Sequence, residues 1–371
     1  MASSTIKQPF DTLDLVLLDS GAPKRAVIFA RCGPNVAVAR LSYGDEIKDL
    51  LKVRQLIEDS MYGKAPKKPT AGELSDFGNR LFGLIIRDKV KQLYDLLPPS
   101  HVRILILSDS PDLQALPWEF IQQTAKASGP RRNRSVARVV STIGVPAPEP
   151  LTSEKKIRVL FAYANPQDQD ESVDWDGVLQ SIQESFAAYI DPDKLDLVLV
   201  REVTSMSLLK KLQEGQYDVL HFSGHGTVHK GVGRLIFNNG NDDSAYITAE
   251  KLAGILRDRG IRLVVLSACQ TASGDFQSEF SVTAQTLVAE GIPAVVANQM
   301  PVYNQTVAPF VGTMYDQLLR FGDIDQAVNE GRMTLSTLLS RNDLSPTDQA
   351  SPDWGIPTLY RHIAGAEIFK L

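Results

Sequence analysis

The second half of the chain alternates short apolar runs with amphipathic segments, and this alternation constrains the fold more than any other feature. Runs such as Arg262–Ala268 (RLVVLSA) are followed by stretches with apolar residues at helical spacing, such as Ser281–Glu290. The runs are too uniformly apolar for strands with one face in water, so they indicate a parallel sheet buried on both faces. We therefore predict an α/β fold with a mainly parallel sheet flanked by helices on both faces. The expected strands are Ile157–Tyr163, Leu195–Val200, Val219–Phe222, Leu235–Phe237, Arg262–Ala268 and Ala294–Ala297, and the expected helices lie near Val178–Tyr189, Met206–Gln213, Thr248–Arg259, Ser281–Glu290, Val307–Phe321 and Asp325–Ser340.

The first 150 residues give a less regular mixture of strands and helices. Arg25–Arg31 and Asn35–Leu41 are apolar runs on either side of a Cys-Gly-Pro turn, and they predict a hairpin. Helical spacing covers Glu46–Ser60 and Asp76–Leu97, while Val102–Leu107 predicts a buried strand. This half is therefore expected to be a smaller α/β unit.

A connector separates the two halves. The stretch Gly144–Lys156 (GVPAPEPLTSEKK) gathers three prolines and then charges, a composition that disfavours both helix and sheet. We predict an amino-terminal α/β half at residues 1–150 and a second domain at residues 151–371.

The composition limits the expected cellular compartment and the kinds of partner. The only two cysteines, Cys32 and Cys269, provide no disulfide framework, which is typical of a reducing compartment. A net charge of -5 gives no electrostatic drive towards nucleic acid. Neither an export signal nor an apolar run long enough for a membrane span stands out. We expect a cytoplasmic protein with no direct nucleic-acid partner and no membrane contact.

Two strand ends carry the residues with the most distinctive chemistry. In DVLHFSGHG an apolar strand is followed by His225 between two glycines, and in RLVVLSACQ the strand ends at Cys269. Neighbouring strands of an open α/β sheet present such residues to one crevice at their carboxyl ends. A thiol is mostly protonated at neutral pH and needs a nearby imidazole to become a nucleophile. His225 and Cys269 are therefore the predicted catalytic pair, and the amides of Gly226 and Cys269 are the predicted donors to an oxyanion.

These motifs are familiar in combination. HFSGHG followed by LSACQTASGD resembles the CHAT domain, the peptidase family related to caspases, separase and gingipains. Three further segments resemble recurring parts of CHAT domains in the same order, so the resemblance covers roughly residues 75 to 371. They are LPWEFI at Leu116–Ile121, EGIPAVVANQMPV at Glu290–Val302 and LLRFGDIDQAVNEGRMTL at Leu318–Leu335.

The resemblance implies a caspase-like fold whose first half is a smaller, degenerate and inactive caspase-like unit. It implies a cysteine endopeptidase that needs no cofactor, with Cys269 as the nucleophile and His225 as its general base or ion-pair partner. The implied partners are a protein substrate, bound as an extended peptide beside the catalytic sheet, and an activating or regulatory protein. Family members commonly serve regulated proteolysis in bacterial defence, including antiviral defence, or in cell-death signalling.

The resemblance also indicates a substrate cleft, with one departure from the relatives. Metacaspases and caspases often place an acidic or an amide-bearing specificity residue, respectively, two positions before the nucleophile, where this chain has Ser267. A deep charged P1 pocket is therefore not supported from that strand, and a basic preference through Asp275 and a neutral preference both stay open. The predicted substrate-binding residues are Ser267, Asp275, Asn298, Gln299, Met300 and Pro301.

Several other polar residues have less specific interpretations. We expect His221, inside its strand, to pack or to orient the following loop, and His229 to be solvated in a loop. No metal site is predicted, because Cys269, His221 and His225 lack a fourth ligand at informative spacing. Cys32 is interpreted as structural, and Trp118 as core packing where the halves meet. The basic run Arg131, Arg132, Arg134 and Arg138 predicts a solvated loop, with a site for an acidic partner as the alternative.

Two further classes of function stay open at the level of sequence. One is a catalytically silent interaction module that binds a partner in a signalling assembly. The other is an acyltransferase or ligase built on the same thioester. The intact His225 and Cys269 favour the peptidase over the silent module.

Overall fold

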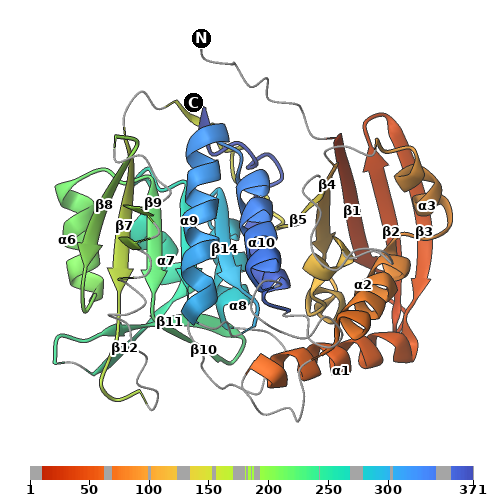
Figure 1. Cartoon of the computed structure of the whole chain (residues 1–371), viewed down its shortest axis with the longest axis horizontal. Helices are drawn as coiled ribbons and strands as arrows, with labels where there is room; N and C mark the ends of the chain where they lie inside the picture. Colours follow the sequence, from red (N-terminus) through yellow and green to blue (C-terminus); the bar gives the residue numbers. More distant parts are fainter. Residues whose placement is uncertain are drawn as a thin grey trace.

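The computed structural model describes residues 11–61, 69–98, 102–122, 134–152, 156–169, 180, 183–184, 186–187, 193–241, 243–267, 279–300, 304–339 and 352–370. Its central feature is an eleven-stranded sheet with helices on both faces (Figure 1). This confirms the predicted α/β fold class. Within the described part of the chain, no helix is long and apolar enough to span a bilayer.

Most of the large sheet consists of two blocks of parallel strands that run in opposite directions, and the hairpin strand β2 is antiparallel to its neighbours β1 and β3. Its order is β3-β2-β1-β4-β5-β15-β14-β13-β9-β7-β8. Strands β1, β4, β5 and β15 are parallel to one another, β15 is antiparallel to β14, and β14, β13, β9, β7 and β8 are again mutually parallel. The bounds are β1 Asp11–Asp19, β2 Arg25–Cys32, β3 Asn35–Ser42, β4 Val102–Ser108, β5 Arg134–Val139, β7 Ile157–Tyr163, β8 Leu195–Val200, β9 Val219–Ser223, β13 Leu263–Ser267, β14 Ala294–Asn298 and β15 Pro357–Arg361.

The remaining strands lie outside this sheet. The expected strand at Leu235–Phe237 is part of a separate three-stranded antiparallel sheet, not of the parallel one, because its neighbours pair with it as consecutive hairpins. That sheet consists of β10 His225–His229, β11 Val232–Asn238 and β12 Ser244–Thr248. A two-stranded pair joins β6 Leu151–Thr152 to β16 Phe369–Lys370.

Helices cover both faces of the sheet. Successive strand residues point to opposite faces, so Val265 packs in the core cluster that contains Met314 of α9, while Val264 packs in the cluster that contains Leu287 of α8. In Figure 1, α9 and α10 lie in front of the sheet and α7 and α8 behind it. The helices are α1 Gly44–Met61, α2 Ala71–Ile85, α3 Asp88–Asp95, α4 Pro111–Gln114, α6 Ser205–Glu214, α7 Ala249–Leu256, α8 Glu279–Ala289, α9 Asn304–Phe321 and α10 Ile324–Leu339, with 3₁₀ helices η1 Trp118–Gln122 and η2 Pro352–Gly355.

The helical spacing over Asp76–Leu97 corresponds to two helices, α2 and α3. The interruption falls where Asp88, the first residue of α3, adopts a positive φ of 49°. That left-handed conformation does not continue a right-handed helix. Most of the helix expected near Val178–Tyr189 lies outside the described residues.

The sheet and the core continue from one half of the chain into the other. Strand β5 of the first half pairs with β15 of the second, and the cluster that contains Leu13 and Val136 also contains Val265 and Met314. Trp118 is buried in this same cluster, as predicted. The division into two domains at residue 151 stays a prediction.

Candidate active site

The register of β9 and β13 organises the candidate site. The two strands are parallel neighbours, and Ser223 at the end of β9 is paired with Ser267 at the end of β13. His225 follows Ser223 by two residues, as Cys269 follows Ser267. The pairing extends past the strands, since the amide of Gly224 donates to the carbonyl oxygen of Ser267 at 3.2 Å. Cys269 itself, with Asp275 and Pro301, lies outside the described residues.

His225 is buried and begins β10, whereas the sequence indicated a loop. It is paired with Ile236 of β11, and the next residue, Gly226, is paired with Leu235. Burial lowers the pKa of His225 below the ordinary value of 6.5. An imidazole with a lowered pKa is neutral at neutral pH, which is the form that accepts a proton from a thiol.

Glycines allow the close packing around His225. A Cβ on Gly224 would lie 2.7 Å from the ring of Phe222 and 3.1 Å from the carbonyl oxygen of Ala164. A Cβ on Gly233 of β11 would lie 2.8 Å from the backbone nitrogen of Thr283 in α8. Both positions therefore exclude a side chain, and the second lets α8 approach the small sheet that carries His225.

His221 lies two residues before the end of β9 and has a structural environment, which confirms the expectation that it packs. Its Nε2 is 2.8 Å from Oγ of Ser267, its Nδ1 is 3.4 Å from the hydroxyl of Tyr315, and its ring is 4.7 Å from that of Phe161. Burial lowers the pKa of His221 to about 3. His221 is therefore a neutral packing group beneath the candidate site.

The predicted substrate residues are placed differently from one another. Ser267 and Asn298 line one cavity, together with Thr306 and Phe310 of α9. Gln299 is buried, and so is Met300. The role of all these residues in substrate binding stays a prediction. The side chain of Gln299 is already hydrogen-bonded to other residues of the protein.

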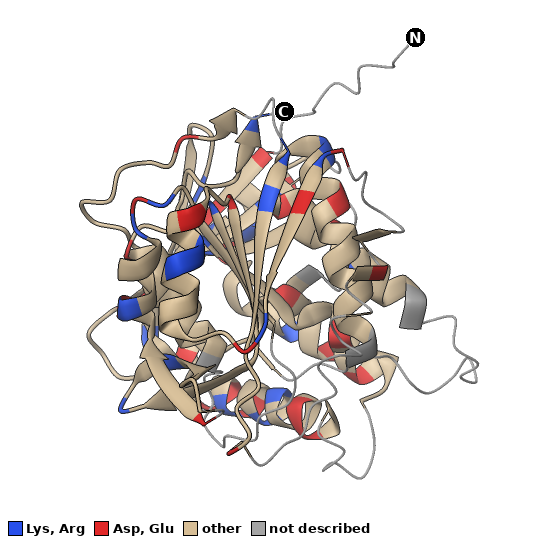
Figure 2. Ribbon diagram, turned by 90° about the vertical axis from the view of Figure 1, so that its left-hand side faces the viewer, with Lys and Arg blue, Asp and Glu red and all other residues tan. Residues whose placement is uncertain are grey.

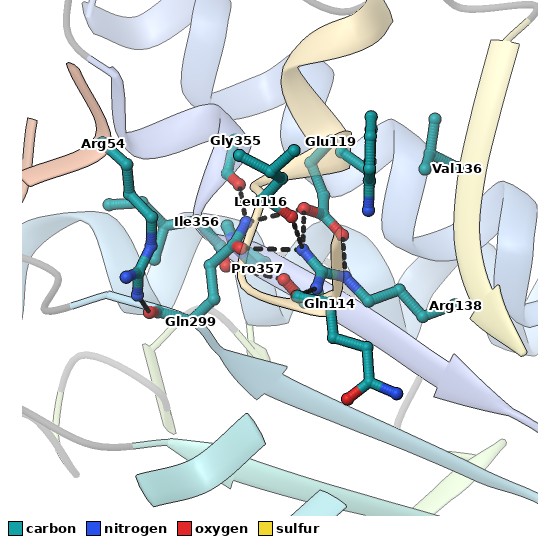
Figure 3. A network of polar contacts seen from close by, with 12 residues as sticks. Arg54, Gln114, Leu116, Glu119, Val136, Arg138, Gln299, Gly355, Ile356 and Pro357 are labelled. Atoms are coloured by element: carbon teal, nitrogen blue, oxygen red, sulfur yellow. Dashed lines mark hydrogen bonds and ion pairs between the residues drawn. The ribbon is translucent and has the colours of Figure 1, made fainter. Parts of the chain in front are cut away.

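A buried polar network at the junction of the halves was not predicted (Figure 3). Arg138 of β5 donates from Nε to Oε1 of Glu119 at 3.1 Å and from Nη2 to Oε2 at 2.8 Å, and Nη2 also reaches Oε1 of Gln299 at 2.9 Å. Arg332 of α10 donates to the carbonyl oxygens of Val136 and Pro357. The partners of Arg138 are 19 and 161 positions away in sequence, so no local pattern indicated the network.

The prediction that the basic run forms a solvated loop is wrong for two of its four residues. Arg134 and Arg138 are buried in β5, while Arg131 and Arg132 lie outside the described residues. Burial of Arg138 is sustained by the carboxylate of Glu119, whose position beside β5 only the fold establishes.

In the part of the chain that the structure describes, positively and negatively charged side chains are intermixed (Figure 2). Figure 2 shows Lys and Arg interspersed with Asp and Glu over the ribbon. His229 is exposed at the end of β10, in a strand where a loop was expected. Among the described residues, no group of three or more His, Cys, Asp or Glu side chains is arranged to hold a metal ion.

The fold and the two paired strand ends define a caspase-like α/β protein. The sequence matches the CHAT domain family over residues 75–362, and the chain belongs to that family. This confirms the resemblance seen in its motifs. No curated protein matches it significantly.

Solved structures support the fold. Two structures of the Saccharomyces cerevisiae separase–securin complex resemble it over 95% of this chain, one with 12% identity and a TM-score of 0.52, the other with 11% and 0.50. This chain spans 30% of the matched chain's length in both. At such identities the likeness shows the fold alone.

Proposed function

We propose that this protein is a cysteine endopeptidase that uses His225 and Cys269. The CHAT fold supports a protease-type module, and the register of β9 and β13 carries the assignment of residues. Two parallel strands are paired at Ser223 and Ser267, and His225 and Cys269 each follow two positions later in the sequence, so we expect both residues at the same end of the two strands.

The proposed reaction is hydrolysis through a thioester. His225 takes the proton of the Cys269 thiol, and the thiolate attacks the carbonyl carbon of the scissile peptide bond. The amides of Gly226 and Cys269 donate to the oxyanion. His225 then gives the proton to the leaving amine, and water releases the new carboxyl terminus in the second half of the cycle. No cofactor is needed.

The proposed substrate is an extended segment of another protein, bound against the segment Asn298–Met300 at the carboxyl end of β14. The P1 pocket involves Ser267, and Asp275 if the preference is basic. A regulatory protein is a further proposed partner, since the similar separase structures contain securin. We place the activity in regulated cytoplasmic proteolysis, such as antiviral defence or cell-death signalling in bacteria.

The test is a mass-spectrometric census of new protein amino termini in a bacterial lysate. We expect new amino termini in the lysate treated with the wild-type protein, and none of them in lysates treated with Cys269→Ala or His225→Ala. Cys32→Ala is the matched control, because Cys32 lies at the end of β2 and burial raises the pKa of its thiol. New amino termini that persist with Cys269→Ala contradict the assignment. Their absence from the wild-type digest favours a latent enzyme that awaits an activating protein, or the silent interaction module.

A further inference from the structure

The side-chain amide of Gln299 makes three hydrogen bonds to buried protein groups. Its Nε2 donates to Oε2 of Glu119 at 2.7 Å and to the carbonyl oxygen of Gly355 at 2.8 Å, while its Oε1 accepts from Arg138. Its backbone is held as well, because its amide donates to the carbonyl oxygen of Ile356 and its carbonyl oxygen accepts from Arg54. Figure 3 shows these groups converging on Gln299 from both sides.

Three of these partners come from the first half of the chain. Arg54 lies in α1, Glu119 in η1 and Arg138 in β5. Each is at most 7% exposed. Burial acts to raise the pKa of Glu119, but the charge and hydrogen bonds of Arg138 outweigh it and lower the pKa. The pair is therefore ionised, and its orientation is fixed by directional bonds to Gln299.

Gln299 lies beside the candidate catalytic strand end. Strands β13 and β14 are parallel, with Leu266 paired to Ala297. One step further along this register, Asn298 is level with Ser267, which precedes Cys269 by two residues. Gln299 follows directly, so the groups that hold it also set the path of the segment where we place the bound peptide.

We propose that Glu119 and Arg138 are positioning residues for the substrate cleft, acting through Gln299 on the segment Asn298–Met300. The proposal rests on the proposed peptidase function, because it assigns this segment to the bound peptide. If Glu119 and Arg138 have this role, the first half of the chain helps to set the geometry of the substrate cleft in the second half.

A positioning role is distinguishable from simple stabilisation. Replacing a buried ion pair by apolar residues of similar volume is often neutral or stabilising, because the desolvation cost disappears with the charges. We expect such a replacement of Glu119 and Arg138 to leave a folded protein, and it removes two of the three polar partners of the Gln299 side chain. The carbonyl oxygens of Gln114 and Leu116 also lose their hydrogen bonds from Arg138, a cost that the thermal midpoint measures. A displacement of about 1 Å can lower a reaction rate about 100-fold. The rate of cleavage should therefore fall much more than the stability of the protein does.

The main experiment compares the double variant Glu119→Leu with Arg138→Met against a matched junction variant. The control is Arg103→Met with Asp323→Asn, which removes the partly buried ion pair between β4 and the residue before α10, together with the contact of Arg103 with Asp325, without touching Gln299. Three quantities are measured on each full-length protein: the thermal midpoint, amide hydrogen exchange of a peptide covering residues 298–300, and kcat/KM on a substrate identified from the amino-terminal census.

We expect the Glu119 and Arg138 variant to keep a cooperative transition, to exchange faster at residues 298–300 and to lose about 10- to 100-fold in kcat/KM. The control should change neither exchange at that segment nor kcat/KM. Gln299→Met is the second test, because it leaves the ion pair in place and should show the same two defects.

The outcomes separate this proposal from the function on which it rests. If the wild-type protein cleaves in a Cys269-dependent manner but all variants match the control in exchange and kcat/KM, the positioning role is overturned and the peptidase stands. A wild-type protein that does not cleave even with Cys269 intact favours the silent module or a peptidase that awaits its activating protein. Unchanged exchange at residues 298–300 in the variants then overturns the positioning role independently.

Discussion

At the scale of single residues, His221 is a neutral imidazole held inside the protein. Its ring lies against Phe161, its two nitrogens face Ser267 and Tyr315, and burial lowers its pKa from 6.5 to about 3. Between these two pH values the unfolded chain binds a proton at His221 that the folded protein does not. The contribution to stability is therefore complete above pH 6.5 and is lost as the pH falls towards about 3.

We predict that His221→Gln makes the protein less sensitive to acid. The free energy of unfolding of the wild type should fall by up to about 1.4 kcal/mol per pH unit through this one group, and the variant should lack that component. Urea unfolding at a series of pH values between 3 and 7 measures the slope. His229→Gln replaces an exposed histidine on β10 and serves as the control. Equal slopes for wild type and His221→Gln would contradict the assigned protonation state.

The sequence offers clear candidates for some residues of the proposed site and no signal for others. His225 and Cys269 stand at the ends of apolar runs with flanking small residues, a local pattern that the chain itself displays. Glu119, Arg138 and Gln299 have no such pattern, because their contacts join positions 161 and 180 residues apart. Their burial depends on pairing between elements, and a charged residue in a sequence looks the same whether it is paired or solvated.

At the scale of elements, the turn from β9 into β10 is the connection that places His225. Gly224 lies in this turn, and a Cβ there would clash with the ring of Phe222 and the carbonyl oxygen of Ala164. The backbone at Gly224 packs tightly against these groups where the chain passes from the large sheet into the small one.

Gly224→Ala should therefore damage both stability and the site. We expect a loss of about 1–3 kcal/mol in the free energy of unfolding, typical of overpacking, and a lower rate of cleavage because His225 follows directly. Gly254→Ala is the matched control: this glycine lies in α7, and a Cβ added there would have nothing within 4 Å, so the same change should stabilise by up to about 1 kcal/mol. Denaturant unfolding of both variants measures these changes. A Gly224→Ala variant with an unchanged free energy of unfolding would contradict the packing argument.

The elements that the sequence predicted share a physical character. Strand β7 is a largely buried run and β8 a partly buried one, both rich in Leu, Val and other apolar residues, and both match their predicted bounds. Strand β5 was missed because its sequence, RSVARV, carries two arginines that only the fold neutralises. Strand β10 was missed because HGTVH has glycine and histidines where a strand usually has apolar residues.

At the scale of the whole molecule, the two halves share one sheet, one core cluster and the polar network. Strand β15 pairs with β5 on one side and with β14 on the other. Arg332 in α10 is fully buried and donates to the carbonyl oxygen of Val136 in β5. A second half without its first half would expose the edge of β15 and leave Arg332 and Gln299 without these partners, which is costly for buried polar groups.

We predict that the full chain unfolds in one cooperative transition and that residues 151–371 do not fold alone. Calorimetry of the full chain should give equal calorimetric and van't Hoff enthalpies, since a shared core couples the halves. The fragment should lack a cooperative transition and should recover one when residues 1–150 are supplied as a separate chain. A fragment that melts cooperatively by itself, or a full chain with two transitions, would show that the connector at residues 144–156 separates independent domains, and the first half would then have no part in shaping the cleft through folding.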